Sequence, residues 1–139
     1  MEIKRFNPLD KKLMEQIYNI LKNHYKITAL ILFGSRARND HLPYSDYDIL
    51  IIADFQENYL DRINNILNHL IYIKINIEIY PYTLKEALLM LKNGNPTIFD
   101  ALDEGITFFK NSEFTILEKL FQELKNKGMK RSKTSIILP

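Results

Sequence analysis

The stretch Leu32 to Leu50, LFGSRARNDHLPYSDYDIL, decides how this sequence folds. A short apolar run over residues 28–33 suits a strand that is buried on both faces, and it ends at Gly34. Gly34 has no Cβ, so its backbone can approach an anion closely, and a helical turn beginning at Ser35 presents free amide groups and a hydroxyl. The junction predicts a phosphate-binding turn, although such junctions also occur as purely structural turns.

Two aspartates, Asp46 and Asp48, open the next predicted strand, which covers residues 46–53. Because side chains alternate along a strand, both carboxylates should lie on one face, and their mutual repulsion favours a cation between them. Carboxylate oxygens suit Mg²⁺, which binds them together with water and substrate phosphates. The alternative is that Asp46 caps the preceding loop and that Asp48 is a solvated residue at the strand end.

A third acid, Glu78, lies on the polar side of an alternating strand predicted over residues 74–80. If this strand lies beside the strand over residues 46–53, Glu78 can meet Asp46 and Asp48. Three carboxylates can hold two Mg²⁺ ions about 4 Å apart, an arrangement that serves in-line phosphoryl or nucleotidyl transfer. Taken alone, Glu78 would be a solvent-facing strand residue, and only its combination with the other features indicates catalysis.

The remaining elements follow from hydrophobic spacing and capping signals: Asn7 as an N-cap, a capping box formed by Thr83 and Glu86, and Asn95-Pro96 at the start of a further short helix. Pro81 should end the strand that carries the third acid. One helix is predicted to bury an apolar stripe formed by Leu60, Ile63, Leu67 and Leu70. The fold class is therefore α/β (α+β), with a small mixed sheet flanked by helices. The other predicted helices and a short strand cover approximately residues 7–26, 83–94, 95–104, 106–109 and 112–128.

Length and charge describe a small protein with an uneven charge distribution. The 139 residues include no cysteine, which excludes disulfides and thiolate metal sites. Five basic residues and no acid fall in the last fifteen positions, so the remaining body, with 14 basic and 17 acidic residues, argues against nucleic-acid binding. We expect one domain over residues 1–125 and a basic, flexible tail over residues 126–139. We also expect a soluble, cytoplasmic protein, because no apolar segment resembles a signal peptide or membrane span.

The segments GSRARND at residues 34–40 and SDYDIL at residues 45–50 carry a family resemblance. They resemble the G-S-x(6–12)-D-x-D pattern of the DNA polymerase beta nucleotidyltransferase superfamily, in the form typical of its minimal nucleotidyltransferase (MNT) branch. The resemblance extends from the first helix to about Gly105 and implies a nucleotidyltransferase fold. Asn39 departs from the pattern, since many relatives have glycine there, but asparagine tolerates the left-handed conformation that glycine often adopts.

The resemblance implies that ATP is the substrate and that its phosphates bind at the glycine-serine turn. Gly34 and Ser35 would bind the β- and γ-phosphates. Arg36 and Arg38 would help to neutralise the triphosphate, and the alternative for Arg38 is an exposed arginine in a salt bridge.

The resemblance also implies roles for the three acids in catalysis. Asp46 and Asp48 would ligate both Mg²⁺ ions, and Glu78 would be the third acid that aligns the nucleophile. Many relatives have aspartate at the third position, and the glutamate side chain here reaches about one bond further. Metal binding is therefore implied more directly than full catalytic competence.

The size of the chain points to one group of relatives. Template polymerases, tRNA-nucleotide adders, poly(A) polymerases and aminoglycoside-modifying relatives carry additional domains, which leaves solitary MNT proteins similar to antitoxins of HEPN-domain toxins. The resemblance implies transfer of AMP from ATP to a tyrosine hydroxyl of a HEPN ribonuclease, within a hetero-oligomer; a homodimer is an alternative assembly. Two other functions stay open: nucleotidyl transfer to a small molecule or an RNA end, and a catalytically inactive antitoxin that acts by binding alone.

Overall fold

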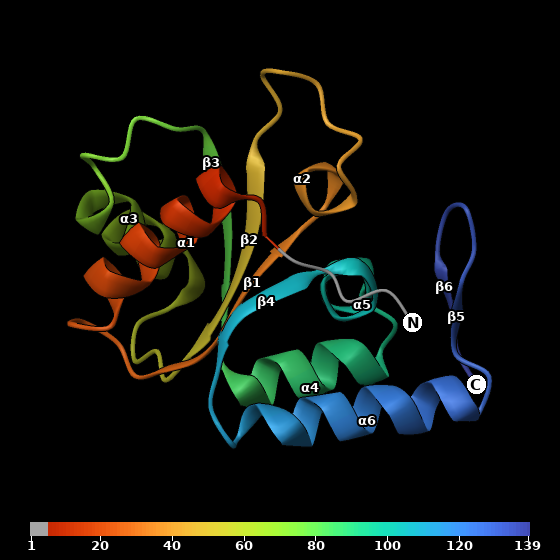
Figure 1. Ribbon diagram of the computed structural model, residues 1–139. Helices are drawn as coiled ribbons and strands as arrows, with labels where there is room; N and C mark the ends of the chain where they lie inside the picture. The colour runs from red at the N-terminus through yellow and green to blue at the C-terminus, as the bar shows by residue number, and fades with distance from the viewer. Residues whose placement is uncertain (1–5) are drawn as a thin grey trace.

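A four-stranded mixed sheet forms the centre of the molecule in this computed structural model, which describes residues 6–139 (Figure 1). The strands are β1 (Ile27–Phe33), β2 (Tyr47–Ala53), β3 (Ile77–Tyr82) and β4 (Ile106–Lys110). They lie in the order β3-β2-β1-β4, with β1 antiparallel to both of its neighbours and β2 parallel to β3. The predicted α/β class with a small mixed sheet is confirmed, and β3 does lie beside β2.

Helices cover both faces of this sheet. One face packs against α1 (Pro8–Leu21) and α3 (Tyr59–His69), and the other against α4 (Leu84–Lys92), α5 (Pro96–Glu104) and α6 (Phe114–Asn126) (Figure 1). A short helix, α2 (Ser35–Arg38), follows β1 directly. Because β1 is central and covered on both faces, every one of its residues is buried, as the unbroken apolar run predicted.

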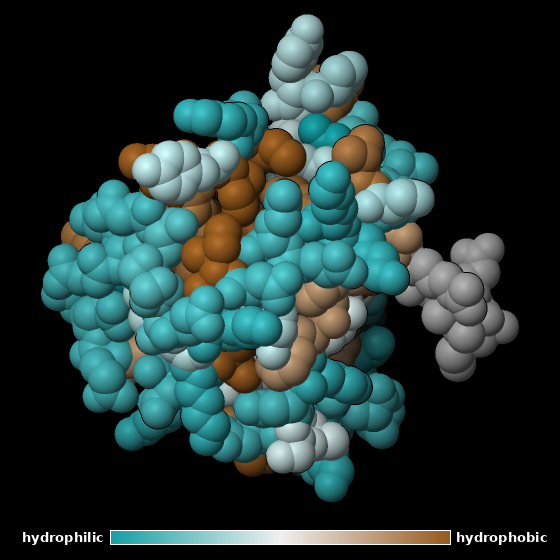
Figure 2. All heavy atoms as spheres, turned by 60° about the vertical axis from the view of Figure 1, so that its left-hand side comes forward, coloured by the Kyte–Doolittle hydropathy of each residue, from teal (hydrophilic) through white to brown (hydrophobic). Residues whose placement is uncertain are grey.

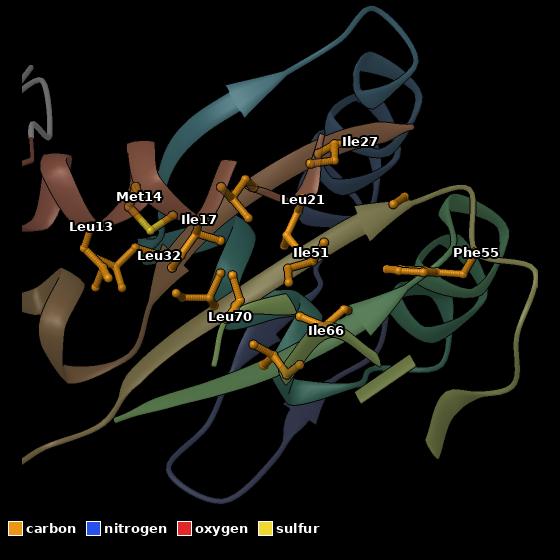
Figure 3. Packing of buried hydrophobic residues seen from close by; sticks show 14 residues of the cluster. Leu13, Met14, Ile17, Leu21, Ile27, Leu32, Ile51, Phe55, Ile66 and Leu70 are labelled. Carbon is orange, nitrogen blue, oxygen red and sulfur yellow. The ribbon is translucent and has the colours of Figure 1, made fainter. Parts of the chain in front are cut away.

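The core beneath α1 shows how the sheet is held in place (Figure 3). Met14, Ile17 and Leu21 of α1 are fully buried and belong to the same cluster as Leu32 of β1 and Ile51 of β2. Burial of each such side chain stabilises the fold by about 1.5–3 kcal/mol. The strands that carry the candidate site are therefore anchored by α1 from one side.

Several local signals in the sequence are confirmed by the backbone. The side chain of Asn7 caps α1, and that of Asn95 caps α5. Thr83 and Glu86 form the predicted capping box at the start of α4. Asn39 adopts the left-handed conformation with φ of 61°, as expected for a position that is glycine in many relatives. These signals act within one turn of the chain, so the rest of the fold does not override them.

The predicted apolar stripe on α3 is only half confirmed: Leu70 is buried and Ile63 packs against the core, but the other two residues are exposed. Leu60 is 72% exposed and Leu67 is 44% exposed, whereas Ile66 and Arg62 are buried. Arg62 replaces a hydrophobic residue on the inner face because its guanidinium finds partners there, including an ion pair with Glu86 at 2.7 Å. The inner face of the helix therefore includes a buried, paired arginine, which hydropathy alone does not indicate.

The boundaries of two other elements also differ from expectation. α1 ends at Leu21 instead of near residue 26, because residues 22–24 form a turn. β3 begins at Ile77 and continues through Pro81 to Tyr82, so the prediction that Pro81 ends the strand is wrong. A proline is tolerated there because β3 lies at the edge of the sheet, where one side of the strand needs no backbone donor.

The C-terminal residues fold back against the helices. β5 (Lys130–Arg131) and β6 (Ile136–Ile137) form a small antiparallel hairpin. Its Arg131 pairs with Asp100 of α5 at 3.2 Å, and Met129 at its base is only 3% exposed. The charge of Arg131 in this segment therefore lies against an acid of α5.

When the molecule is turned so that the side with α1 and α3 comes forward, the visible surface is mostly hydrophilic, with a band of apolar side chains across its middle (Figure 2). Within residues 6–139, no helix is both long enough and apolar enough to cross a membrane.

Candidate active site

The turn after β1 packs directly against Asp48. Gly34 has φ of 74° and ψ of −157°, a combination that is essentially restricted to glycine. Phe33 is paired with Asp48 in the β1–β2 ladder, so the next residue lies beside the carboxylate. A Cβ on Gly34 would collide with Oδ2 of Asp48. Glycine is thus required here both by the backbone conformation and by the close approach to the acid.

The short helix α2 presents polar groups beside this contact. The carbonyl of Gly34 accepts from the amides of Ala37 and Arg38, each at 3.1 Å, which closes the turn. The first amides of a helix have no partner within it, and here they lie next to the hydroxyl-bearing Ser35. This is the arrangement that the predicted phosphate-binding turn requires.

The acids gather on the sheet face that turns toward α4 and α5. Asp48 and Glu78 are direct partners in the parallel β2–β3 ladder, and Asp46 precedes β2 by one residue. Asp48 is half-buried, whereas Asp46 and Glu78 are exposed. Burial raises the pKa of Asp48, and the charges of Glu78 and Asp46 raise it further, while Arg38 opposes them. The repulsion that the sequence predicted is therefore present at Asp48.

The fit of a divalent ion depends on the two aspartates. Within residues 6–139, no three acidic or histidine side chains are placed so as to hold one ion together. Mg²⁺ usually takes only one or two carboxylates, with water and substrate phosphates as its other ligands. Asp46 and Asp48, whose charges act on each other, are the two residues that could hold such an ion, and Glu78 lies beside Asp48 in the ladder.

Tyr80 is a residue of this site that the sequence reasoning did not single out. It lies two positions after Glu78 on the same face of β3, and its ring contacts Phe33 with centroids 5.2 Å apart. Burial raises the pKa of its hydroxyl, and the charges of Asp48 and Glu78 raise it further. Its spacing of two from Glu78 could have indicated this position.

Arg36 is engaged with the loop before β2. Its Nε and Nη2 donate to the carbonyl of Ser45 at 3.2 and 2.9 Å, and Nη2 donates to that of Pro43 at 3.4 Å. Its guanidinium stacks on the ring of Tyr47, with Cζ 4.3 Å from the centroid. These contacts stabilise the loop, whatever further role Arg36 has toward a triphosphate.

Arg38 forms the salt bridges that were the alternative interpretation of this residue. It pairs with Asp40 at 3.0 Å and with Glu104 of α5 at 2.7 Å. The hydrogen bonds with Asp40 and Glu104 hold its pKa above the ordinary value. Since its charge also lowers the pKa of Asp48, Arg38 lies close enough to influence the site.

Comparison with known proteins identifies related sequences over most of this region. The family model described as "Polymerase beta, Nucleotidyltransferase" matches residues 15–114. Three proteins of Methanocaldococcus jannaschii, each named "Putative protein adenylyltransferase", are similar to the chain. One is 34% identical over 100 residues and another 35% over 104, each match covering 70% of this chain and 92% of the relative. The third is 42% identical over 53 residues, which span 37% of this chain and 53% of the relative.

Solved structures show the same fold at low sequence identity. A chain of a toxin-antitoxin complex with AMP-PNP superposes with a TM-score of 0.55 at 14% identity, covering 85% of this chain and 91% of that chain. A chain from a complex described as a tri-AMPylated Shewanella oneidensis HEPN toxin with MNT antitoxin superposes with a TM-score of 0.50 at 14% identity, covering 86% and 89%. At these identities the likeness concerns the fold.

Proposed function

Because the chain belongs to the polymerase beta nucleotidyltransferase family, we propose that it transfers AMP from ATP to a tyrosine hydroxyl of a partner HEPN-domain toxin. The observation that carries this proposal is the contact of the Gly34 turn with Asp48, which is itself paired with Glu78 in the sheet. An anion-binding turn and a group of acids thus share one patch, as transfer from a triphosphate requires.

Two observations favour a protein as the acceptor. The relatives that match most of the chain carry the name of protein adenylyltransferases, and two of the structural neighbours come from toxin-antitoxin complexes, one with an AMPylated HEPN toxin. Asp46 and Glu78 are exposed, so a hydroxyl presented on the surface of another protein can reach them.

In this proposal each residue of the site has a separate role in the reaction. Gly34 and Ser35 would bind the β- and γ-phosphates, and Asp46 and Asp48 would hold Mg²⁺, which would supply charge neutralisation at the phosphates. Glu78 orients the acceptor hydroxyl and takes up its proton. The acceptor oxygen forms a bond to the α-phosphorus, the bond from that phosphorus to the bridging oxygen of the β-phosphate breaks, and pyrophosphate leaves.

Intact-mass spectrometry tests this function directly. The protein is incubated with ATP, Mg²⁺ and its HEPN partner, and the partner should gain the mass of one or more AMP units. Asp48→Asn should abolish the gain, whereas Asp54→Asn, an exposed aspartate just beyond the far end of β2, should leave it intact. Equal labelling by Asp48→Asn would refute the assigned site, and a stable complex without labelling would show an antitoxin that acts by binding alone.

A further inference from the structure

The loop over residues 39–46 delivers Asp46 to the site but has little structure of its own. Leu42 is 73% exposed and Tyr44 is 90% exposed. Two bonds close it internally, from the amide of Ser45 to the carbonyl of Leu42 and from the amide of Leu42 to the hydroxyl of Ser45, each at 3.0 Å. The position of Asp46 therefore depends on what fixes the two ends of this loop.

Arg36 contacts the residue on each side of Asp46. Its guanidinium donates twice to the carbonyl of Ser45, which precedes Asp46, and stacks on the ring of Tyr47, which follows it. A planar, five-donor guanidinium is suited to making both contacts at once, because its edge binds the carbonyl while its face covers the ring. Asp46 is thus held between two neighbours that share one arginine.

The contact continues from Tyr47 into the core. The hydroxyl of Tyr47 donates to Oδ1 of Asp10 at 2.8 Å, and Asp10 is only 5% exposed. Oδ2 of Asp10 accepts from Nδ2 of Asn7 at 2.9 Å, so the series ends in the first turn of α1. α1 is anchored by fully buried residues, including Met14 and Ile17. The position of the loop is therefore fixed, through Tyr47 and Asp10, by a well-anchored helix on the opposite face of the sheet.

We propose that Arg36 is a positioning residue that fixes Asp46 for the divalent ion, with Tyr47 and Asp10 as its support, and that it is not a ligand of the triphosphate. This inference rests on the proposed function, because it takes Asp46 as a metal ligand. Two donor atoms and one face of Arg36 are already engaged, so a move onto phosphate would release the loop that holds Asp46.

Arg36→Lys separates the two roles, because lysine keeps the charge but lacks the planar fork. A positioning role predicts ATP affinity in EDTA within twofold of wild type by calorimetry. It also predicts that Mn²⁺ affinity, measured by electron paramagnetic resonance, falls by about 10–100-fold, the usual loss when a group that supports a metal ligand is altered. A large loss of ATP affinity in EDTA with unchanged Mn²⁺ affinity would assign Arg36 to the triphosphate and overturn the inference.

Tyr47→Phe tests the support without touching Arg36. Loss of the hydroxyl should weaken Mn²⁺ binding and speed chymotryptic cleavage after Tyr44, while the midpoint of thermal unfolding stays within a few degrees of wild type. Tyr72→Phe, at a side chain that is 88% exposed after α3, is the matched control and should change neither. Unchanged cleavage and unchanged Mn²⁺ affinity in Tyr47→Phe would refute the support.

The result for wild type separates this inference from the proposed function. If wild type binds Mn²⁺ and labels its partner but Arg36→Lys binds Mn²⁺ equally well, only the positioning role fails. If wild type binds no Mn²⁺, the metal site and the positioning role fail together.

Discussion

Gly34→Ala tests the contact on which the site depends. The backbone conformation at Gly34, with φ of 74° and ψ of −157°, costs an alanine about 1–3 kcal/mol. The added methyl group would also collide with Oδ2 of Asp48 and force that side chain out of its preferred rotamer, which costs about 0.5–1.5 kcal/mol more. We therefore expect the free energy of unfolding to fall by about 2–4 kcal/mol.

Two comparisons separate the energetic cost of backbone strain at Gly34 from the cost of the collision with Asp48. Gly128 also has positive φ, at 112°, but a Cβ there would meet nothing within 4 Å, so Gly128→Ala should report backbone strain alone. In an Asp48→Ala background the collision is absent, and Gly34→Ala should cost about 1 kcal/mol less than in wild type. Urea unfolding followed by circular dichroism measures all four variants. Equal costs of Gly34→Ala in both backgrounds would refute the close approach to Asp48.

Three further predictions concern stability in metal-free buffer. Asp48→Asn should raise the thermal midpoint at neutral pH, because burial and two neighbouring acids raise the pKa of Asp48. A carboxyl with a raised pKa destabilises the fold as the pH rises from its ordinary pKa through the raised one. The thermal midpoints of the variant and of wild type, measured by circular dichroism, should therefore converge at lower pH. Glu86→Gln should lower the free energy of unfolding by about 1–2 kcal/mol at neutral pH, because it leaves the buried Arg62 without its charge partner. This value is reduced to allow for the partial exposure of Glu86. Burial acts to raise the pKa of Glu86, but hydrogen bonds from Arg62 and Thr83 outweigh it and lower the pKa, so this cost should disappear in urea titrations as the pH falls through the lowered value. In urea unfolding, Ile66→Ala should lower the free energy of unfolding by about 2–5 kcal/mol and Leu67→Ala by about 0.5 kcal/mol or less. Equal losses would mean that Leu67 is buried, as the stripe predicted from hydropathy requires.

The features that could be predicted from the sequence are those that local chemistry determines. The left-handed Asn39, the capping box of Thr83 and Glu86 and the alternation of β3 all depend on residues within a few positions of each other. The approach of Glu78 to Asp48 needed one additional assumption, that β3 lies beside β2, and the register confirms it.

The features that could not be predicted depend on partners that are distant in the sequence. Arg62 is buried because Glu86 lies opposite it, and hydropathy gives no sign of that pairing. Pro81 stays in a strand because β3 lies at the sheet edge, which is a property of the topology. The anchoring of Arg36 to Ser45 likewise needs the folded loop, since the motif alone shows only an arginine near a phosphate-binding turn.

The placement of the site within the chain has a consequence for the order of folding. Gly34, which directly follows β1, and Asp48 of the neighbouring antiparallel strand β2 are 14 positions apart, so closing the loop between them costs little entropy. Glu78 comes 30 positions after Asp48 and joins through a parallel pairing that must wait for the α3 crossover. The part of the site that would bind the nucleotide can therefore assemble early in folding, and the part that would meet the acceptor is completed when the edge strand docks.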